Sequence, residues 1–370
     1  MFYIRSFIMD IIIYGAQGYA LGAYNAITFL HPEQKVMFFM VTAMGNNASS
    51  LCNLPVREIE SVSKEFSADK KKNTEVLIAT PESVHPEIEE ILNEYGFDHH
   101  SCLTSERWNE MMRELYSRTG DFLPLAELTA GDVSVGMCVY MAKSHVDKSL
   151  KRDFVVPDYM IPIQVGSANT GEIIADVRDN IGDNISSKNA NYCELTGLYW
   201  VWKNVLQADL CGSGTCDYYG FAQYRRMLML SDEDLTRLGP NDVDVVLPYP
   251  LLYEPDINAH HERYLKEADW SALITAMQEL QPEYAKVFPD VLKQRYMFNY
   301  NVILAKKEVL RDYCEWLFPI LERTEELSEP KGCERADRYI GYMGETLETL
   351  YFMKNKDRLN IRYSGCRLLV

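Results

Sequence analysis

Asp217-Tyr-Tyr-Gly-Phe-Ala-Gln-Tyr-Arg225-Arg226 is a run of apolar and aromatic residues that ends in two adjacent arginines. Its composition is typical of a buried β-strand. In α/β proteins ligands bind beyond the ends of strands, and guanidinium groups match the oxygens of phosphates and carboxylates. The stretch therefore predicts an α/β fold with an anion site at this strand end. The simpler alternative is a strand that ends in a solvated pair of charges.

The N-terminal part of the chain alternates strand and helix patterns. Continuous apolar runs occupy residues 11–14, 36–41 and 75–79, with helical segments after the first and third runs. Apolar strands separated by helices indicate a parallel sheet covered on both faces. We expect a small Rossmann-like domain over residues 10–118.

Three glycines follow the first predicted strand, at Gly15, Gly18 and Gly22. The strand-turn-helix context suits a nucleotide-binding loop, but the spacing differs from the dinucleotide fingerprint. No acidic residue closes the next strand. The glycines therefore indicate either a bound nucleotide or tight packing of the first helix against its strand.

A polar stretch at 119–157 is predicted to be a linker or connecting element, and a second α/β domain is expected over 158–370. Within that domain the pattern predicts four strands and three helices. The strands are expected at 160–166, 218–222, 243–247 and 299–304, and the helices at 191–205, 308–321 and 337–353. His260-His261 is predicted to lie in a loop because no third ligand stands at metal spacing.

Composition excludes several classes of function. The net charge of -17 argues against binding to nucleic acid and against broad adhesion to anionic lipid. No apolar run approaches the ~20 residues of a membrane helix. The nine cysteines lack metal-ligand spacing, so we expect reduced thiols and a cytoplasmic protein.

Several ordered motifs resemble one bacterial family. They are Asp-Asn-Ile-Gly-Asp-Asn-Ile-Ser at 179–186, Tyr-Cys-Glu at 192–194, Tyr-Arg-Arg at 224–226, Tyr-Asn-Val-Ile-Leu at 300–304 and Gly-Tyr-Met-Gly-Glu at 341–345. Over about 160–350 the chain resembles a glycosyltransferase-like family, a domain of unknown function found in capsular and exopolysaccharide gene clusters. The resemblance implies a GT-A-like fold and transfer of a sugar, expected to be a hexose, from a nucleotide-sugar donor to a polysaccharide precursor.

Such a transfer needs a cation near the leaving diphosphate and, in an inverting reaction, a base for the acceptor hydroxyl. We assign the first role to Arg225 and Arg226. For the base, Glu345 is the first candidate and Asp183 the second.

Four further residues complete the predicted donor site. Asp179 and Asn184 are expected to bind donor hydroxyls, Gly166 to admit the nucleotide close to the backbone, and Asn301 to support the site from a later strand.

A literal Asp-x-Asp, Asp242-Val-Asp244, precedes a strand instead of ending one. We therefore favour a surface turn over a metal site at these aspartates. A divalent metal is compatible with the sequence but is not required by it.

The expected partners are a nucleotide-sugar donor and a glycan acceptor, which is expected to be lipid-linked. Contact with the membrane would then be at most peripheral, at its inner face. Two other functions stay open. A Rossmann-type sugar-nucleotide oxidoreductase or epimerase would need a dinucleotide in the N-terminal domain. A non-catalytic nucleotide-sugar binding protein is favoured by Gln223 and Thr346, which stand where the family tends to have His and Arg.

Overall fold

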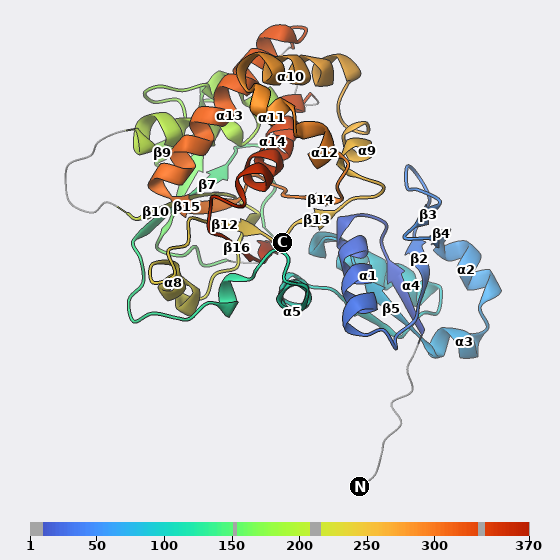
Figure 1. Cartoon of the computed structure of the whole chain (residues 1–370). Coiled ribbons are helices and arrows are strands. Elements are labelled where there is room, and N and C mark those ends of the chain that lie inside the picture. Colours follow the sequence, from blue (N-terminus) through green and yellow to red (C-terminus); the bar gives the residue numbers. More distant parts are fainter. Residues whose placement is uncertain (1–9, 151–153, 208–215, 332–336, 370) are drawn as a thin grey trace. The chain divides into compact units, whose positions relative to one another are not determined.

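The computed structural model describes residues 10–150, 154–207, 216–331 and 337–369. The chain divides into two compact units (Figure 1). Met1–Asp121 and Leu251–Glu254 form the first unit, and Phe122–Pro250 and Pro255–Leu369 form the second.

The first unit contains a six-stranded sheet in the order β3-β4-β2-β1-β5-β6, parallel except for the β3–β4 pair. The strands are β1 (Asp10–Tyr14), β2 (Val36–Val41), β3 (Ser50–Leu51), β4 (Leu54–Glu58), β5 (Thr74–Ile78) and β6 (His100–Cys102). The helices are α1 (Gly18–Leu30), α2 (Ile59–Glu65), α3 (Ala68–Lys72), α4 (His85–Glu94) and α5 (Ser105–Thr119). The unit also includes the short β13 (Leu251–Leu252). The apolar runs form its central strands because they are buried on both faces.

Close packing explains two of the glycines after β1. Gly15 has a φ of +128°, and a Cβ there would lie 2.7 Å from the Ala79 carbonyl oxygen. A Cβ at Gly22 would lie 2.1 Å from the Trp108 ring of α5. Since the packing alone requires these glycines, they give no support to a bound dinucleotide.

The second unit is built on a mixed sheet in the order β16-β12-β15-β10-β7-β8-β9. The strands are β7 (Met137–Lys143), β8 (Met160–Gln164), β9 (Val177–Arg178), β10 (Tyr218–Gln223), β12 (Val245–Pro248), β15 (Ile303–Lys306) and β16 (Ile361–Ser364). Strand β15 runs antiparallel to both of its neighbours, and the other pairs are parallel. Strand β11 (Arg226–Leu228) pairs with β10 and with β17 (Cys366–Leu368).

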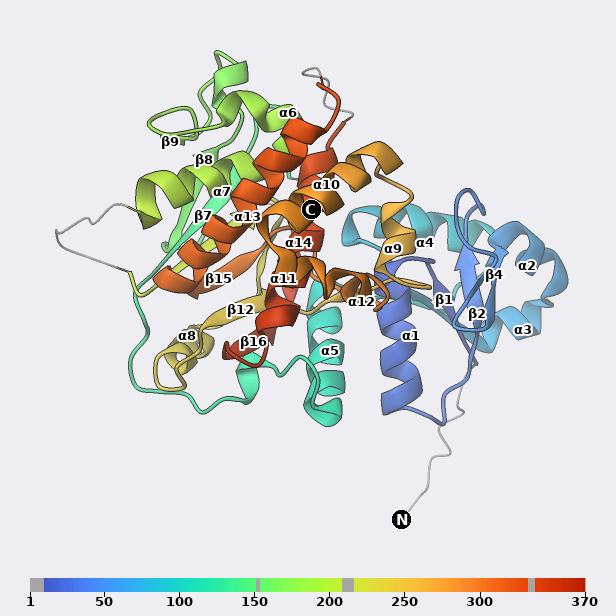
Figure 2. The same ribbon diagram turned by 45° about the horizontal axis from the view of Figure 1, so that its top comes forward.

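Helices pack on this sheet, and α13 is the central one. It contacts α10, α14 and β15 (Figure 2), and it also contacts β10. The helices of the unit are α6 (Asn189–Tyr192), α7 (Leu195–Val201), α8 (Asp232–Leu238), α9 (Ile257–His261), α10 (Glu267–Leu280), α11 (Pro282–Ala285), α12 (Phe288–Leu292), α13 (Lys307–Leu327) and α14 (Tyr339–Asn355), and the unit also has a short strand, β14 (Tyr296–Met297). His260 and His261 end α9, so the prediction of a loop there is wrong.

The helix predicted over 191–205 is broken. Cys193 separates α6 from α7 with a φ of +55° and a ψ of -133°, and a π-helical turn follows at Trp202–Leu206. The Asn189 amide donates to the Cys193 carbonyl oxygen at 2.6 Å. This contact supports a backbone conformation that a non-glycine residue rarely adopts. The result is a sharp elbow that the apolar periodicity could not reveal.

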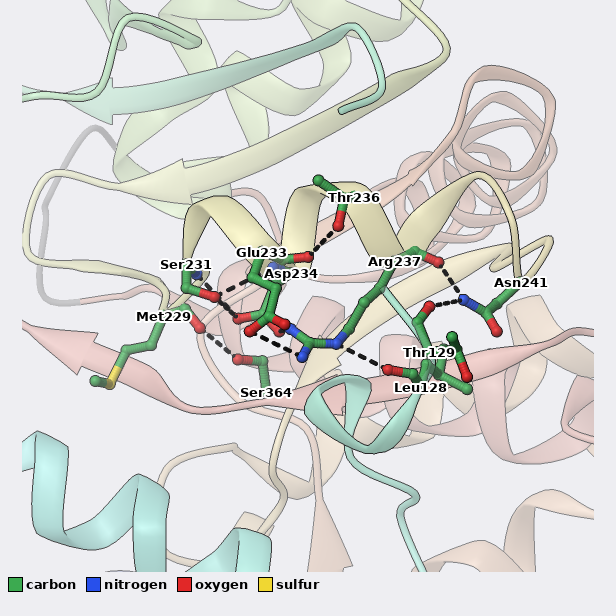
Figure 3. A network of polar contacts seen from close by, with 10 residues as sticks. All are labelled: Leu128, Thr129, Met229, Ser231, Glu233, Asp234, Thr236, Arg237, Asn241 and Ser364. Carbon is green, nitrogen blue, oxygen red and sulfur yellow. Dashed lines mark hydrogen bonds and ion pairs between the residues drawn. The ribbon is translucent and has the colours of Figure 1, made fainter. Parts of the chain in front are cut away.

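Residues 119–157, predicted to connect the domains, contain β7, which lies between β10 and β8 in the sheet. Buried Arg237 of α8 fixes the stretch before β7 (Figure 3). Its Nε donates to the Leu128 carbonyl at 2.9 Å, and its Nη1 pairs with Asp234 at 2.9 Å. This stretch is therefore an integral part of the second unit.

Candidate functional site

Glu345 of α14 lies beside the segment that leads into β15. Its Oε1 accepts from the Tyr300 backbone N–H at 3.1 Å, and its Oε2 accepts from the Asn299 amide at 3.3 Å. Burial and the nearby Glu194 carboxylate raise the Glu345 pKa to about 7, against the opposing effects of the two hydrogen bonds and of Arg226. A carboxyl group with this pKa exchanges a proton readily near neutral pH.

Glu194 is a second acid of the site, and it was not among the residues predicted from the sequence. It follows the elbow at Cys193, and its Oε1 accepts from Gln223 at 3.0 Å and from Asn301 at 2.9 Å. Its place in the Tyr-Cys-Glu motif at 192–194 was the signal that could have identified it.

Arg226 brings a positive charge to the two acids. The arginine pair does not end β10: Arg225 lies in the turn after β10, and Arg226 opens β11. The Arg226 guanidinium lies 3.9 Å from the centroid of the Tyr300 ring, and its Nη1 donates to Gln223 at 3.3 Å. The Leu369 N–H donates to the Arg225 carbonyl at 2.8 Å, so the C-terminal strand helps to hold this turn.

Tyr300 and Asn301 both have left-handed backbones, with φ of +79° and +49°. Such conformations cost about 1–3 kcal/mol each in non-glycine residues and persist only where contacts impose them. Here Tyr300 contacts Arg226 and Glu345, and Asn301 contacts Glu194. The strained pair therefore joins the acids to the arginine.

Asp179 and Gly166, both predicted to contact the donor, make close contacts within the protein. The Asp179 carboxylate is fully buried and accepts four hydrogen bonds, from the Gly166 and Ser167 amides and the Ser186 and Thr196 hydroxyls. A Cβ at Gly166 would lie 2.7 Å from the Asn189 side chain, so the close approach there is by protein. Because Thr196 and the Asn189 side chain also bond the Cys193 carbonyl, this network positions the elbow and hence Glu194.

Asp183 and Asn184 lie in the loop after β9. The Asn184 side chain bonds Gly182 and Ser186 within that loop, as in a local turn. Asp183 is exposed and accepts from the Tyr199 hydroxyl at 3.3 Å. In the described part of the chain, no contact joins Asp183 to Glu345, so the structure does not bring the two predicted bases together.

Asp242 and Asp244 both pair with Lys306, the latter at 2.7 Å. Asp244 also accepts from the Asn360 N–H at 2.8 Å. The ion pairs of the Asp-x-Asp with Lys306 thus link the start of β12 to the end of β15. Within the described ranges, no group of three or more His, Cys, Asp or Glu residues is arranged to hold a metal ion.

Of the predicted site residues, the structure brings together Glu345, Arg226 and Asn301, with Arg225 next to them in the chain. No helix of the described residues is long and apolar enough to cross a membrane.

Comparisons with known proteins bear on the family and the fold. The model of a family described as a domain of unknown function, DUF4422, matches residues 141–356. Among solved structures, the chain is similar to the apo structure of WbbM, a bifunctional glycosyltransferase, with 27% identity and a TM-score of 0.52. The match covers 63% of this chain and 45% of WbbM, so it spans less than half of that protein. A comparison with curated proteins gave no match. The likeness confirms the predicted α/β fold with a GT-A-like domain.

Proposed function

We propose that this chain, which belongs to the DUF4422 family, is a glycosyltransferase that moves a sugar from a nucleotide-sugar donor to a glycan acceptor, since it is similar in structure to the glycosyltransferase WbbM. The observation that carries the proposal is the pairing of Glu345 with Arg226 across Tyr300. A proton acceptor and a fixed cation beside each other are the two groups that this transfer needs.

In the proposed reaction, Glu345 removes the proton of the acceptor hydroxyl as its oxygen attacks the anomeric carbon of the donor. The bond from that carbon to the phosphate oxygen breaks, and its electron pair leaves with the nucleoside diphosphate. A general base in this position suits inversion at the anomeric carbon. With a pKa of about 7, Glu345 is ionised in a large fraction of molecules at neutral pH.

Arg226, together with Arg225, stabilises the negative charge that develops on the leaving diphosphate. Stacking on Tyr300 fixes the Arg226 guanidinium before the donor binds, so little reorganisation is needed during the reaction. The arginines act in place of a metal ion or beside one, since Lys306 already pairs with the Asp-x-Asp.

The cellular role follows from the family resemblance. We propose a hexosyltransferase of capsule or exopolysaccharide synthesis in the bacterial cytoplasm, working at the inner face of the membrane on a lipid-linked acceptor. The chemistry is assigned to the second domain.

The double variant Arg225→Ala/Arg226→Ala tests the phosphate role. Calorimetry with UDP, GDP, dTDP and CMP and their sugars should find a ligand for the wild type, and the variant should lose that binding and all transfer. The control Arg311→Ala/Arg323→Ala removes two arginines from α13 of the same unit and should keep both activities. Normal donor turnover by a folded double variant would refute the assignment.

A further inference from the structure

Helix α14 reaches the surface at two neighbouring side chains. From Tyr339 to Phe352, a segment that the structure describes completely, every residue is buried except Tyr342 and Glu345. Residues three apart lie on the same helix face. Tyr342 and Glu345 therefore share the partly exposed face of this helix, and the proposed base lies one turn away from Tyr342.

A second tyrosine extends this border. The Tyr264 ring lies 5.4 Å from the Tyr342 ring, tilted by 34°, and the His260 ring lies 5.0 Å from Tyr264. Tyr264 is 52% exposed, so its ring offers an aromatic surface next to Tyr342. We call Tyr264 and Tyr342 the tyrosine platform.

Contacts on both sides of Tyr264 hold the platform in place. On one side, His261 bonds the Thr346 hydroxyl of α14 at 2.7 Å and stacks on Trp270. On the other, Lys266 pairs with Asp337 at 3.4 Å. An aromatic surface that is fixed in advance binds a ligand at little entropic cost.

Arg338 adds a polar edge. Its guanidinium lies 5.9 Å from the Tyr342 ring, and its Nε donates to the Cys193 sulfur at 3.0 Å, next to Glu194. The residue is exposed, so its remaining N–H groups can donate to hydroxyl oxygens. Aromatic faces with a few convergent donors are typical of small-molecule sites.

We propose that the tyrosine platform is the acceptor subsite, where a sugar ring of the glycan stacks and presents its hydroxyl to Glu345. The proposal rests on the proposed glycosyltransferase function. A pyranose whose hydroxyls are equatorial presents axial C–H groups on its face, which pack on the negative face of an aromatic ring, while its rim of hydroxyls meets Arg338. The donor diphosphate is recognised elsewhere, by Arg226 on the Tyr300 side of Glu345.

Saturation-transfer NMR with lactose, cellobiose and maltose tests the platform without any turnover. At least one disaccharide should receive saturation at its C–H protons from the wild type. Tyr264→Ala should weaken its affinity about 5- to 10-fold, since an aromatic contact of this kind is worth up to about 1.5 kcal/mol. Tyr264→Phe keeps the ring and should bind like the wild type.

Phe29→Ala is the matched control, because Phe29 is also 52% exposed but lies in the first unit. It should leave binding unchanged. Nucleotide affinity, measured by calorimetry, should be the same in Tyr264→Ala and the wild type. The proposal is overturned if no disaccharide binds, if Tyr264→Ala binds as well as the wild type, or if it loses nucleotide affinity instead. Failure of the proposed function would appear separately, as an absence of transfer from every nucleotide sugar while the disaccharide still binds.

Discussion

Glu345→Gln should remove the activity and stabilise the protein at alkaline pH. The folded environment raises the Glu345 pKa from 4.5 to about 7. Since one pKa unit corresponds to about 1.4 kcal/mol, ionised Glu345 costs the folded state about 3 kcal/mol. This cost is absent at low pH, where Glu345 is protonated in both the folded and the unfolded state. It grows as the pH rises from 4.5 towards 7 and reaches its full value above pH 7.

Glutamine keeps an oxygen for the Tyr300 amide and carries no charge at any pH. The stability gained by Glu345→Gln over the wild type should therefore increase by about 2–3 kcal/mol between about pH 5 and pH 8.5. Urea unfolding at both pH values measures it, and transfer should fall by about 10²–10⁴-fold because the base is lost. Glu315→Gln on the exposed face of α13 is the control and should show neither effect. A gain in stability that does not change with pH would refute the account of the Glu345 environment.

Three further predictions concern stability. Burial lowers the pKa of His261 to about 3, whereas its pKa in the unfolded chain is about 6.5. Neutral His261 therefore contributes stability above pH 6.5, and that contribution is lost as the pH falls towards 3. In urea unfolding at about pH 4, His261→Gln should remove about 3 kcal/mol of this acid-induced loss of stability. Asp244→Ala should lower the free energy of unfolding by about 2–3 kcal/mol, because it leaves half-buried Lys306 paired only with Asp242, whose side chain is 90% exposed. Asp242→Ala should lower it by less than about 1 kcal/mol, since it removes only an exposed ion pair. Because Lys306 already pairs with both aspartates, any shift of the melting temperature by EDTA or Mn²⁺ should be the same in the wild type and in Asp242→Ala, and a shift that Asp242→Ala removes would restore a metal role for the pair.

Continuous apolar runs were sufficient to predict β1 and β2, because strands buried on both faces need no polar alternation. The same rule would have predicted β7, Met137-Cys-Val-Tyr-Met-Ala-Lys143, but its polar flanks led to the interpretation of a linker. The flank before β7 is held by Arg237, which lies more than a hundred residues further along the chain than its partner Leu128. Local composition does not contain such information.

The candidate site was predictable where a residue type carries its own chemistry, as in Glu345 and Arg226. The structural contacts of Asp179 were not predictable, because a carboxylate that orders a loop has the same sequence signature as one that binds a ligand. Glu194 was missed because it depends on the elbow at Cys193, whose backbone conformation is imposed by tertiary contacts.

At Tyr300 and Asn301, whose backbones are left-handed, activity and thermal stability favour different residues. Glycine at either position would relieve strain of about 1 kcal/mol or more, at the cost of the ring under Arg226 or the amide bound to Glu194. A mutant library of this protein screened only for thermal tolerance should therefore enrich glycine at 300 and 301, and those survivors should be the ones that no longer transfer sugar.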